Sequence, residues 1–296
     1  MPILFWILVL ILTLSFGYLF VCIFTTLTLA KVGEHPQYDQ NPSIFGLDFD
    51  KVNFQSRNGH LNLAAWYIPN ERAKGAVILV HGRNASKQNA ISGKFPALAA
   101  EIHKLGLSIL MLDLRGHGES DGKYYTWGWF EKQDVLGAFD YLLGRGYQPG
   151  KIDLLGISLG GAAVIGAAAE ETAVGALVIE STFADLMDLV EPNWTKESGL
   201  PMFFLPGVYL VWKIFFGFDL NKVKPVNEIK AVASRPVLIL HSKDDEVIPV
   251  SHAQTLAEAL PHAQLVLFDN CDHAEIFRDE PEKYLKALIP FLQTLL

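Results

Sequence analysis

Hydrophobic and polar positions divide the chain into stretches of different character. Residues 2–30 are mostly apolar and carry no charge, whereas residues 31–44 are polar and contain glycine and proline. Beyond them, short apolar runs alternate with amphipathic segments. An apolar run of about 20 residues is long enough to cross the hydrocarbon core of a bilayer as a helix. We therefore predict a transmembrane anchor over residues 1–30, a linker over 31–44 and one folded domain over 45–296.

A cleaved signal peptide is the alternative interpretation of the N-terminal run. Such peptides begin with basic residues and have an apolar core of roughly 7–15 residues. Here no Lys or Arg precedes the run, which is much longer, and Thr28-Leu29-Ala30 is a poor cleavage site. The pattern favours a retained single-pass anchor. Lys31 follows the run, but one lysine beside Glu34 leaves the side of the membrane that holds the domain open.

The pattern of the domain predicts a hairpin followed by a mostly parallel sheet. Alternating runs on either side of Asn58-Gly59 predict two antiparallel strands, because this dipeptide favours a tight hairpin turn. Short, largely apolar runs come next, as expected for parallel strands that are covered on both faces. These runs are residues 76–80, 107–112, 152–155, 176–179, 237–240 and 265–268.

Segments with helical character lie between the apolar runs. Most of them place apolar residues at helical spacing, and one is rich in Ala and Gly. They are residues 94–105, 131–143, 159–170, 252–260 and 281–295. Alternation of strands and helices predicts right-handed crossovers and helices on both faces of the sheet. The predicted fold class is therefore α/β, with a mostly parallel sheet of about eight strands.

The formal net charge of the chain is -8, and its Lys and Arg residues are scattered. A protein that binds nucleic acid usually carries a basic patch that neutralises phosphates. The composition therefore argues against a nucleic-acid partner.

One motif carries a clear chemical signal. Gly156-Ile157-Ser158-Leu159-Gly160 follows the apolar run 152–155 and precedes a helical segment. A G-x-S-x-G sequence at a strand-to-helix turn forms a nucleophile elbow, which exposes the serine hydroxyl at the edge of the sheet. The N-terminus of the following helix also favours developing negative charge there. We predict that Ser158 is a nucleophile.

A serine nucleophile needs an acid and a base that follow it in the order Ser, acid, His. Asp244 and Asp245 follow the run 237–240, and His273 follows the run 265–268. Because the carboxyl ends of parallel strands converge at one edge of the sheet, these side chains are expected to meet Ser158.

These motifs resemble the lipase and serine aminopeptidase group of the α/β-hydrolase superfamily over roughly residues 50–296. The resemblance implies an α/β-hydrolase fold, Asp245 as the acid and His273 as the base. Ser242 and Ile248 depart mildly from the family pattern and leave the acid assignment intact. The motifs that carry the resemblance are His81-Gly82, Asp113-Leu114-Arg115-Gly116-His117-Gly118-Glu119-Ser120, the turn at Ser158, Asp245 with Val247 and Pro249, and His273.

Two other carboxylates stay open as the acid. Asp244 is adjacent to Asp245, and Glu180 ends a predicted strand on which some relatives place their acid. Other polar residues near strand ends are expected to be structural. They are His81, His117 and His241, together with an ion pair between Asp113 and Arg115.

The oxyanion hole is predicted from two backbone N–H groups. One belongs to Leu159, directly after the nucleophile, and the other comes from the loop after the third strand. Within that loop the family resemblance selects the N–H of Arg83.

Residues 183–235 contain no strand pattern and are expected to form a helical lid. Within them, Pro201–Phe218 is very apolar. This segment could grip an acyl chain, touch the bilayer or pack on the domain. A second transmembrane span is disfavoured, because Pro201, Pro206 and Lys213 interrupt it.

The sequence thus predicts a membrane-anchored serine hydrolase that cleaves acyl or lipid-like carboxylic esters through an acyl-enzyme. No metal ion or organic cofactor is implied, and the oligomeric state is left open. A peptidase, amidase, thioesterase or acyltransferase would use the same triad. A non-catalytic membrane adaptor on the same scaffold is the alternative from a different class.

Overall fold

The computed structural model describes residues 2–33, 38, 40–232 and 234–293. Contacts divide the chain into two units. The sheet unit consists of residues 32–185 and 224–296, and the helical unit consists of residues 1–31 and 186–223. Part of the predicted linker, residues 34–37 and 39, lies outside the described residues.

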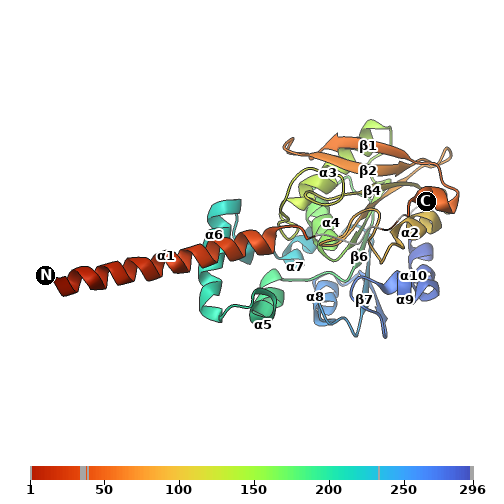
Figure 1. Ribbon diagram of the computed structural model, residues 1–296. Helices are drawn as coiled ribbons and strands as arrows, with labels where there is room; N and C mark the ends of the chain where they lie inside the picture. Colours follow the sequence, from red (N-terminus) through yellow and green to blue (C-terminus); the bar gives the residue numbers. More distant parts are fainter. Residues whose placement is uncertain (1, 34–37, 39, 233, 294–296) are drawn as a thin grey trace. The chain divides into compact units, whose positions relative to one another are not determined.

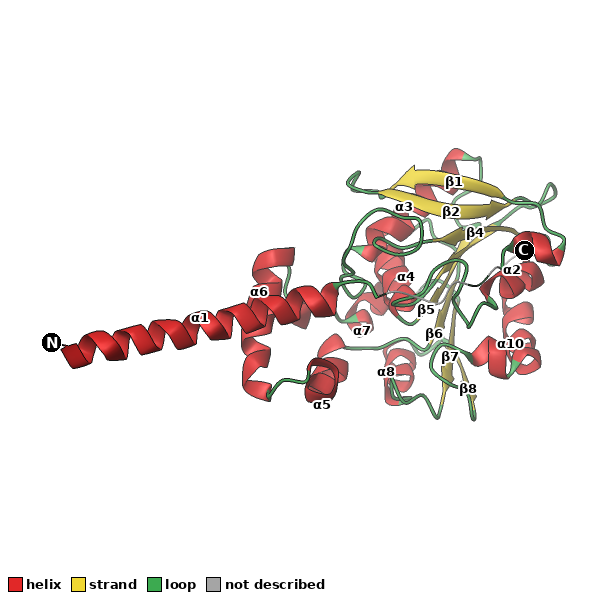
Figure 2. Ribbon diagram, in the orientation of Figure 1, coloured by secondary structure: helices red, strands yellow, loops and turns green. Residues whose placement is uncertain are grey.

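One sheet of eight strands forms the centre of the sheet unit (Figure 1, Figure 2). The strand order is β1-β2-β4-β3-β5-β6-β7-β8, in which β2 is antiparallel to both of its neighbours and the other pairs are parallel. The predicted α/β fold is therefore confirmed. The strands are β1 (Asp50–Gln55), β2 (Asn62–Ile68), β3 (Ala76–Val80), β4 (Ser108–Leu112), β5 (Ile152–Ile157), β6 (Leu177–Glu180), β7 (Val237–Ser242) and β8 (Gln264–Phe268).

Helices cover both faces of the sheet. Ile78 and Val80 of β3 belong to the apolar cluster under α3, α4 and α8, whereas Val77 and Leu79 belong to the cluster under α2, α9 and α10. Burial on both faces explains why the strands are continuous apolar runs. The helices of this unit are η1 (Pro42–Phe45), α2 (Phe95–His103), α3 (Glu131–Gly144), α4 (Leu159–Glu170), α7 (Pro225–Glu228), η4 (Ile229–Val232), α8 (Ser251–Ala259), α9 (Ile276–Asp279) and α10 (Pro281–Gln293).

The predicted hairpin is present between β1 and β2. Its strands pair in register from Asp50 with Tyr67 to Gln55 with Asn62. Gly59 in the connection has a φ of 74°, which glycine adopts without steric cost. The Asn-Gly signal was therefore sufficient to locate the turn.

The helical unit combines the N-terminal helix with the insertion, residues 186–223. Among the described residues, α1 is the only unbroken helix that is long and apolar enough to cross a membrane. A signal sequence would meet the same criteria of length and composition. Of the lid predicted over residues 183–235, residues 183–185, 224–232 and 234–235 belong to the sheet unit, and residue 233 lies outside the described residues. The elements of the helical unit are α1 (Pro2–Ala30), α5 (Leu186–Ser198), η2 (Met202–Phe204), α6 (Leu205–Phe216) and η3 (Leu220–Lys222).

Candidate active site

A sharp turn between β5 and α4 holds Ser158. Its φ of 54° and ψ of -116° are costly for a residue other than glycine, by about 1–3 kcal/mol. A Cβ added at Gly156 would lie 2.4 Å from the carbonyl oxygen of Gly160. A Cβ added at Gly160 would lie 2.5 Å from the carbonyl oxygens of Val80 and His81. The two glycines of the motif are thus required by the close packing of the turn.

Hydrogen bonds connect Ser158, His273 and Asp245 in one line. His273 Nε2 lies 3.0 Å from Ser158 Oγ, and His273 Nδ1 lies 2.7 Å from Asp245 Oδ2. Asp245 Oδ1 accepts the N–H groups of Val247 and Ile248 at 2.9 and 2.8 Å. Burial opposes ionisation of Asp245, but the hydrogen bond and charge of His273, together with the Ile248 N–H, hold the pKa of Asp245 below its ordinary value. An ionised carboxylate therefore stands behind the imidazole.

The two alternative acids have other partners. Asp244 Oδ2 accepts the N–H of Asn270 at 2.7 Å. Glu180 is fully buried, and its Oε2 accepts the hydroxyl of Tyr284 at 2.9 Å. This burial raises the pKa of Glu180 to about 7. The geometry therefore favours Asp245 over Asp244 and Glu180 as the partner of His273.

The Glu180→Gln variant is expected to lose less stability than the wild type as the pH rises. Folding raises the pKa of Glu180 from its ordinary value of about 4.3 to about 7. Between these values the folded state binds more protons than the unfolded state, so the free energy of unfolding falls as pH rises. The contribution of Glu180 is complete below the lower value, and on the order of 3 kcal/mol is lost above the higher one.

Glutamine keeps an oxygen for the Tyr284 hydroxyl but does not titrate, so the variant should lose less stability than the wild type on going from about pH 5 to about pH 8.5. Denaturant unfolding curves of both proteins at these two pH values measure the difference. An identical pH dependence in the two proteins would contradict the assignment of this titration to Glu180.

The loop after β3 passes directly beside Ser158. A Cβ added at Gly82 would lie 3.2 Å from Ser158 Cβ, so the approach requires a small residue. Arg83 comes next and lines the same cavity as Ser158. On the other side, Leu159 is the first residue of α4, and its N–H has no acceptor within the helix. Of the two residues predicted for an oxyanion hole, Leu159 adjoins the serine and Arg83 lines the same cavity.

Two buried histidines connect this loop to the loop after β4. His117 Nε2 accepts the N–H of Asn84 at 3.2 Å, and His81 Nε2 accepts the N–H of Leu114 at 3.1 Å. In each ring Nδ1 lies 2.8 Å from a nearby backbone carbonyl oxygen, to which it donates. These contacts give both histidines the structural role that the sequence predicts.

The predicted ion pair between Asp113 and Arg115 is wrong. The buried carboxylate of Asp113 pairs with the ammonium of Lys87 and accepts the Lys87 N–H at 2.7 Å. Arg115 makes a two-point ion pair with Asp134 of α3, at 2.9 and 2.5 Å. The two side chains of the turn after β4 therefore have different partners. Through Lys87, Asp113 connects this turn to the loop after β3.

A cavity of about 300 Å³ is lined by Ser158 and His273. One wall contains Ile91 and Ser92, whose φ angles of 53° and 45° are strained for residues with a side chain. The Ser92 hydroxyl donates to Glu275 Oε1 at 2.9 Å across a sequence separation of 183 residues. The volume is at the lower end of the range for small-molecule sites.

Sequence reasoning did not identify Ser92 or Glu275 as cavity residues. No local motif marks either position, and their contact depends on how two distant loops meet.

Within the described part of the chain, no group of three or more His, Cys, Asp or Glu side chains is arranged to hold a metal ion.

The strand order and the position of Ser158 define an α/β hydrolase. A sequence profile of the Alpha/beta hydrolase family matches residues 77–287. The chain therefore belongs to this family.

Two relatives match most of the length of this chain. The chain is 28% identical over 300 residues to the uncharacterized protein YfhR of Salmonella typhi, covering 94% of each chain. It is 29% identical to the alpha/beta hydrolase domain-containing protein WAV2 of Arabidopsis thaliana, covering 88% of this chain and 84% of the relative. Two solved structures have a similar fold.

The first is the esterase Pf2001 of Pyrococcus furiosus, with a TM-score of 0.71 and 20% identity over 88% of this chain and 99% of that one. The second is Est1E of Butyrivibrio proteoclasticus, solved with ferulic acid, with a TM-score of 0.65 and 20% identity over 82% of this chain and 99% of that one. At this level of identity the likeness extends to the fold alone.

Proposed function

We propose that this chain is a membrane-anchored serine hydrolase that cleaves acyl or lipid-like carboxylic esters. The observation that carries the proposal is the line of hydrogen bonds from Asp245 through His273 to Ser158. The similar fold of an esterase from Pyrococcus furiosus supports esters as the substrate class.

In the proposed reaction, Ser158 Oγ attacks the ester carbonyl carbon while His273 Nε2 accepts the hydroxyl proton. Asp245 accepts a hydrogen bond from Nδ1–H and stabilises the imidazolium that forms. The N–H groups of Arg83 and Leu159 stabilise the tetrahedral oxyanion. His273 then gives its proton to the leaving alcohol, which leaves an acyl-enzyme on Ser158. Water, deprotonated by His273, attacks the acyl carbon and the acid is released with the serine restored.

The anchor is assigned to α1. The helix has 29 residues, and most of its apolar side chains are exposed, as expected for a helix that faces lipid. Its length exceeds the roughly 7–15 apolar residues of a signal peptide. Intact mass of the protein purified from the membrane fraction tests this part: residues 2–30 should be present.

The full-length protein in phospholipid nanodiscs should hydrolyse p-nitrophenyl esters and prefer them to the matching p-nitroanilides. A series from short to long acyl chains, followed by absorbance of p-nitrophenol, measures this preference. The Ser158→Ala variant in the same nanodiscs corrects for uncatalysed hydrolysis.

Turnover of anilides or thioesters without turnover of any ester would replace the ester proposal by an amidase or thioesterase. Absence of turnover with every substrate would favour a non-catalytic adaptor. In either case the ester proposal fails.

A further inference from the structure

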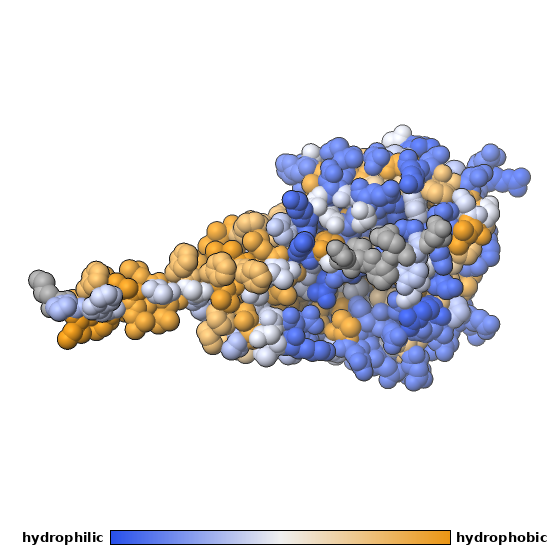
Figure 3. Space-filling model, viewed as in Figure 1, coloured by the Kyte–Doolittle hydropathy of each residue, from blue (hydrophilic) through white to orange (hydrophobic). Residues whose placement is uncertain are grey.

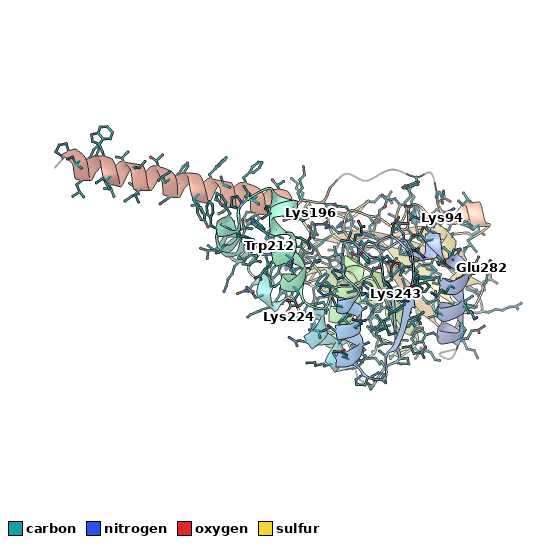
Figure 4. All side chains as sticks on the ribbon, turned by 90° about the horizontal axis from the view of Figure 1, so that it is seen from below. Lys94, Lys196, Trp212, Lys224, Lys243 and Glu282 are labelled. Atoms are coloured by element: carbon teal, nitrogen blue, oxygen red, sulfur yellow. The ribbon has the colours of Figure 1, made fainter. Side chains whose placement is uncertain are left out.

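Within the helical unit, the insertion (residues 186–223) packs against the C-terminal half of α1. The Tyr18 hydroxyl donates to the Phe203 carbonyl oxygen at 2.9 Å, and the rings of Tyr18 and Phe204 stack with centroids 5.1 Å apart. A Cβ added at Gly207 would lie 2.5 Å from the Tyr18 hydroxyl and from Cys22 Sγ. Glycine therefore lets α6 approach α1 closely, as small residues do between helices in membranes. In Figure 4, α6 carries the labelled Trp212 and lies beside α1.

The insertion also has apolar side chains that are exposed. Between residues 200 and 218 the only charged residue is Lys213, whose ammonium lies 3.1 Å from Asp219. Figure 3 shows apolar side chains covering α1 and the helices packed on it. Apolar surface of this kind is unfavourable in water. The exposed apolar side chains of η2 and α6, each more than half exposed, are Met202, Phe203, Leu210, Ile214 and Phe215.

The position along α1 at which η2 and α6 make contact indicates which medium covers their exposed apolar side chains. Helix α1 has 29 residues and is about 43 Å long, whereas the bilayer core is about 30 Å thick. The contacts lie near Tyr18, Cys22 and Thr26, towards the end at which the chain continues into the domain. At this level Phe20 and Phe24 of α1 are themselves 62% and 61% exposed. A medium that covers these side chains of the anchor also reaches α6.

A second transmembrane span does not explain the surface. The 12 residues of α6 make a helix of about 18 Å, too short to cross the bilayer core. The α5 segment is bent by 116° from the η2–α6 segment. Helix α5 also carries charges in its sequence, Asp188, Glu191, Lys196 and Glu197. An element that lies in the interface and buries one side is consistent with all three observations.

We propose that η2 and α6 insert into the bilayer leaflet from which α1 leaves the membrane. Their exposed apolar side chains lie among acyl chains beside Phe20 and Phe24, and Lys213 extends its ammonium towards the headgroups. The insertion thus takes a lipid surface as its partner and forms a second membrane contact next to the anchor. The inference rests on the proposed anchoring by α1 and is independent of the proposed ester hydrolysis.

Spin labels on the full chain in phosphatidylcholine–phosphatidylglycerol vesicles test this proposal. The variants are Ile214→Cys on α6, Leu12→Cys on α1 and Lys222→Cys on η3. Cys22 and Cys271 are buried, so the wild type controls for background labelling. Power saturation compares collisions with oxygen, which concentrates in lipid, and with a water-soluble nickel chelate. The oxygen-to-nickel ratio at positions 214 and 12 should be several-fold higher than at position 222.

Each other outcome overturns the proposal in a distinguishable way. A ratio at position 214 equal to that at position 222, with a lipid-like ratio at position 12, leaves the anchor intact and refutes insertion of α6. Low collision rates with both reagents at position 214 indicate protein contact, such as a second copy of the chain, and also refute it. A water-like ratio at position 12 refutes the anchor and the insertion together.

Discussion

The Ser158→Ala variant is expected to lose at least about 10³-fold in kcat for any ester that the wild type hydrolyses. Without Oγ no acyl-enzyme forms, and the remaining rate comes from substrate binding and the oxyanion hole. The loss should appear in kcat and not in KM, because the hydroxyl acts in the transition state. Steady-state kinetics in nanodiscs measure both constants.

The Ser92→Ala variant is a matched control for this prediction. It removes a hydroxyl from the wall of the same cavity, where Ser92 donates to Glu275 and accepts from Arg278. Its rate should stay within about tenfold of the wild type, since neither of these hydrogen bonds involves Ser158, His273 or Asp245 and each contributes about 1 kcal/mol. If Ser158→Ala kept more than a tenth of the wild-type kcat, Ser158 would not be the nucleophile.

The Asp245→Asn variant is expected to lose about 10⁴-fold in kcat. An asparagine can donate to the imidazole, which stabilises the tautomer with the proton on Nε2 and leaves no acceptor for the Ser158 proton. The Asp244→Asn variant makes the same change in charge at the adjacent position, where the carboxylate bonds the N–H of Asn270. It should remain within about tenfold of the wild type, because it leaves the hydrogen bond to His273 in place.

Measurement of kcat for both variants on the preferred ester decides between the two carboxylates. A larger loss for Asp244→Asn than for Asp245→Asn would move the acid to position 244. Similar thermal unfolding of the two variants is the control for a general loss of structure.

Local patterns predicted most of the sheet unit. Buried parallel strands are apolar runs. Gly59 marked the hairpin turn because the positive φ that it adopts there is favourable for glycine. The motif around Ser158 was readable for a similar reason, since the close approach at Gly156 and Gly160 excludes side chains. Each of these signals is contained within a few neighbouring residues.

Contacts between distant segments were not predictable in this way. Lys87 meets Asp113 across 26 positions, and nothing local distinguishes this carboxylate from one that pairs with Arg115. The same holds for Gly207, which nothing in the neighbouring sequence distinguishes from other helix glycines. Its role is to leave room for Tyr18 and Cys22, which a Cβ at this position would clash with. Such choices are made by packing, which the sequence encodes only through the whole fold.

The pairing of α1 with α6 also imposes an order of events during synthesis. The contact between Tyr18 and Phe203 joins residues 185 positions apart. At roughly 5–20 residues per second, translation of the intervening chain takes about 10–40 s. During that interval the side of α1 that later receives Gly207 has no partner from the insertion. Helix α1 therefore completes its packing only after β5 and β6 have been made.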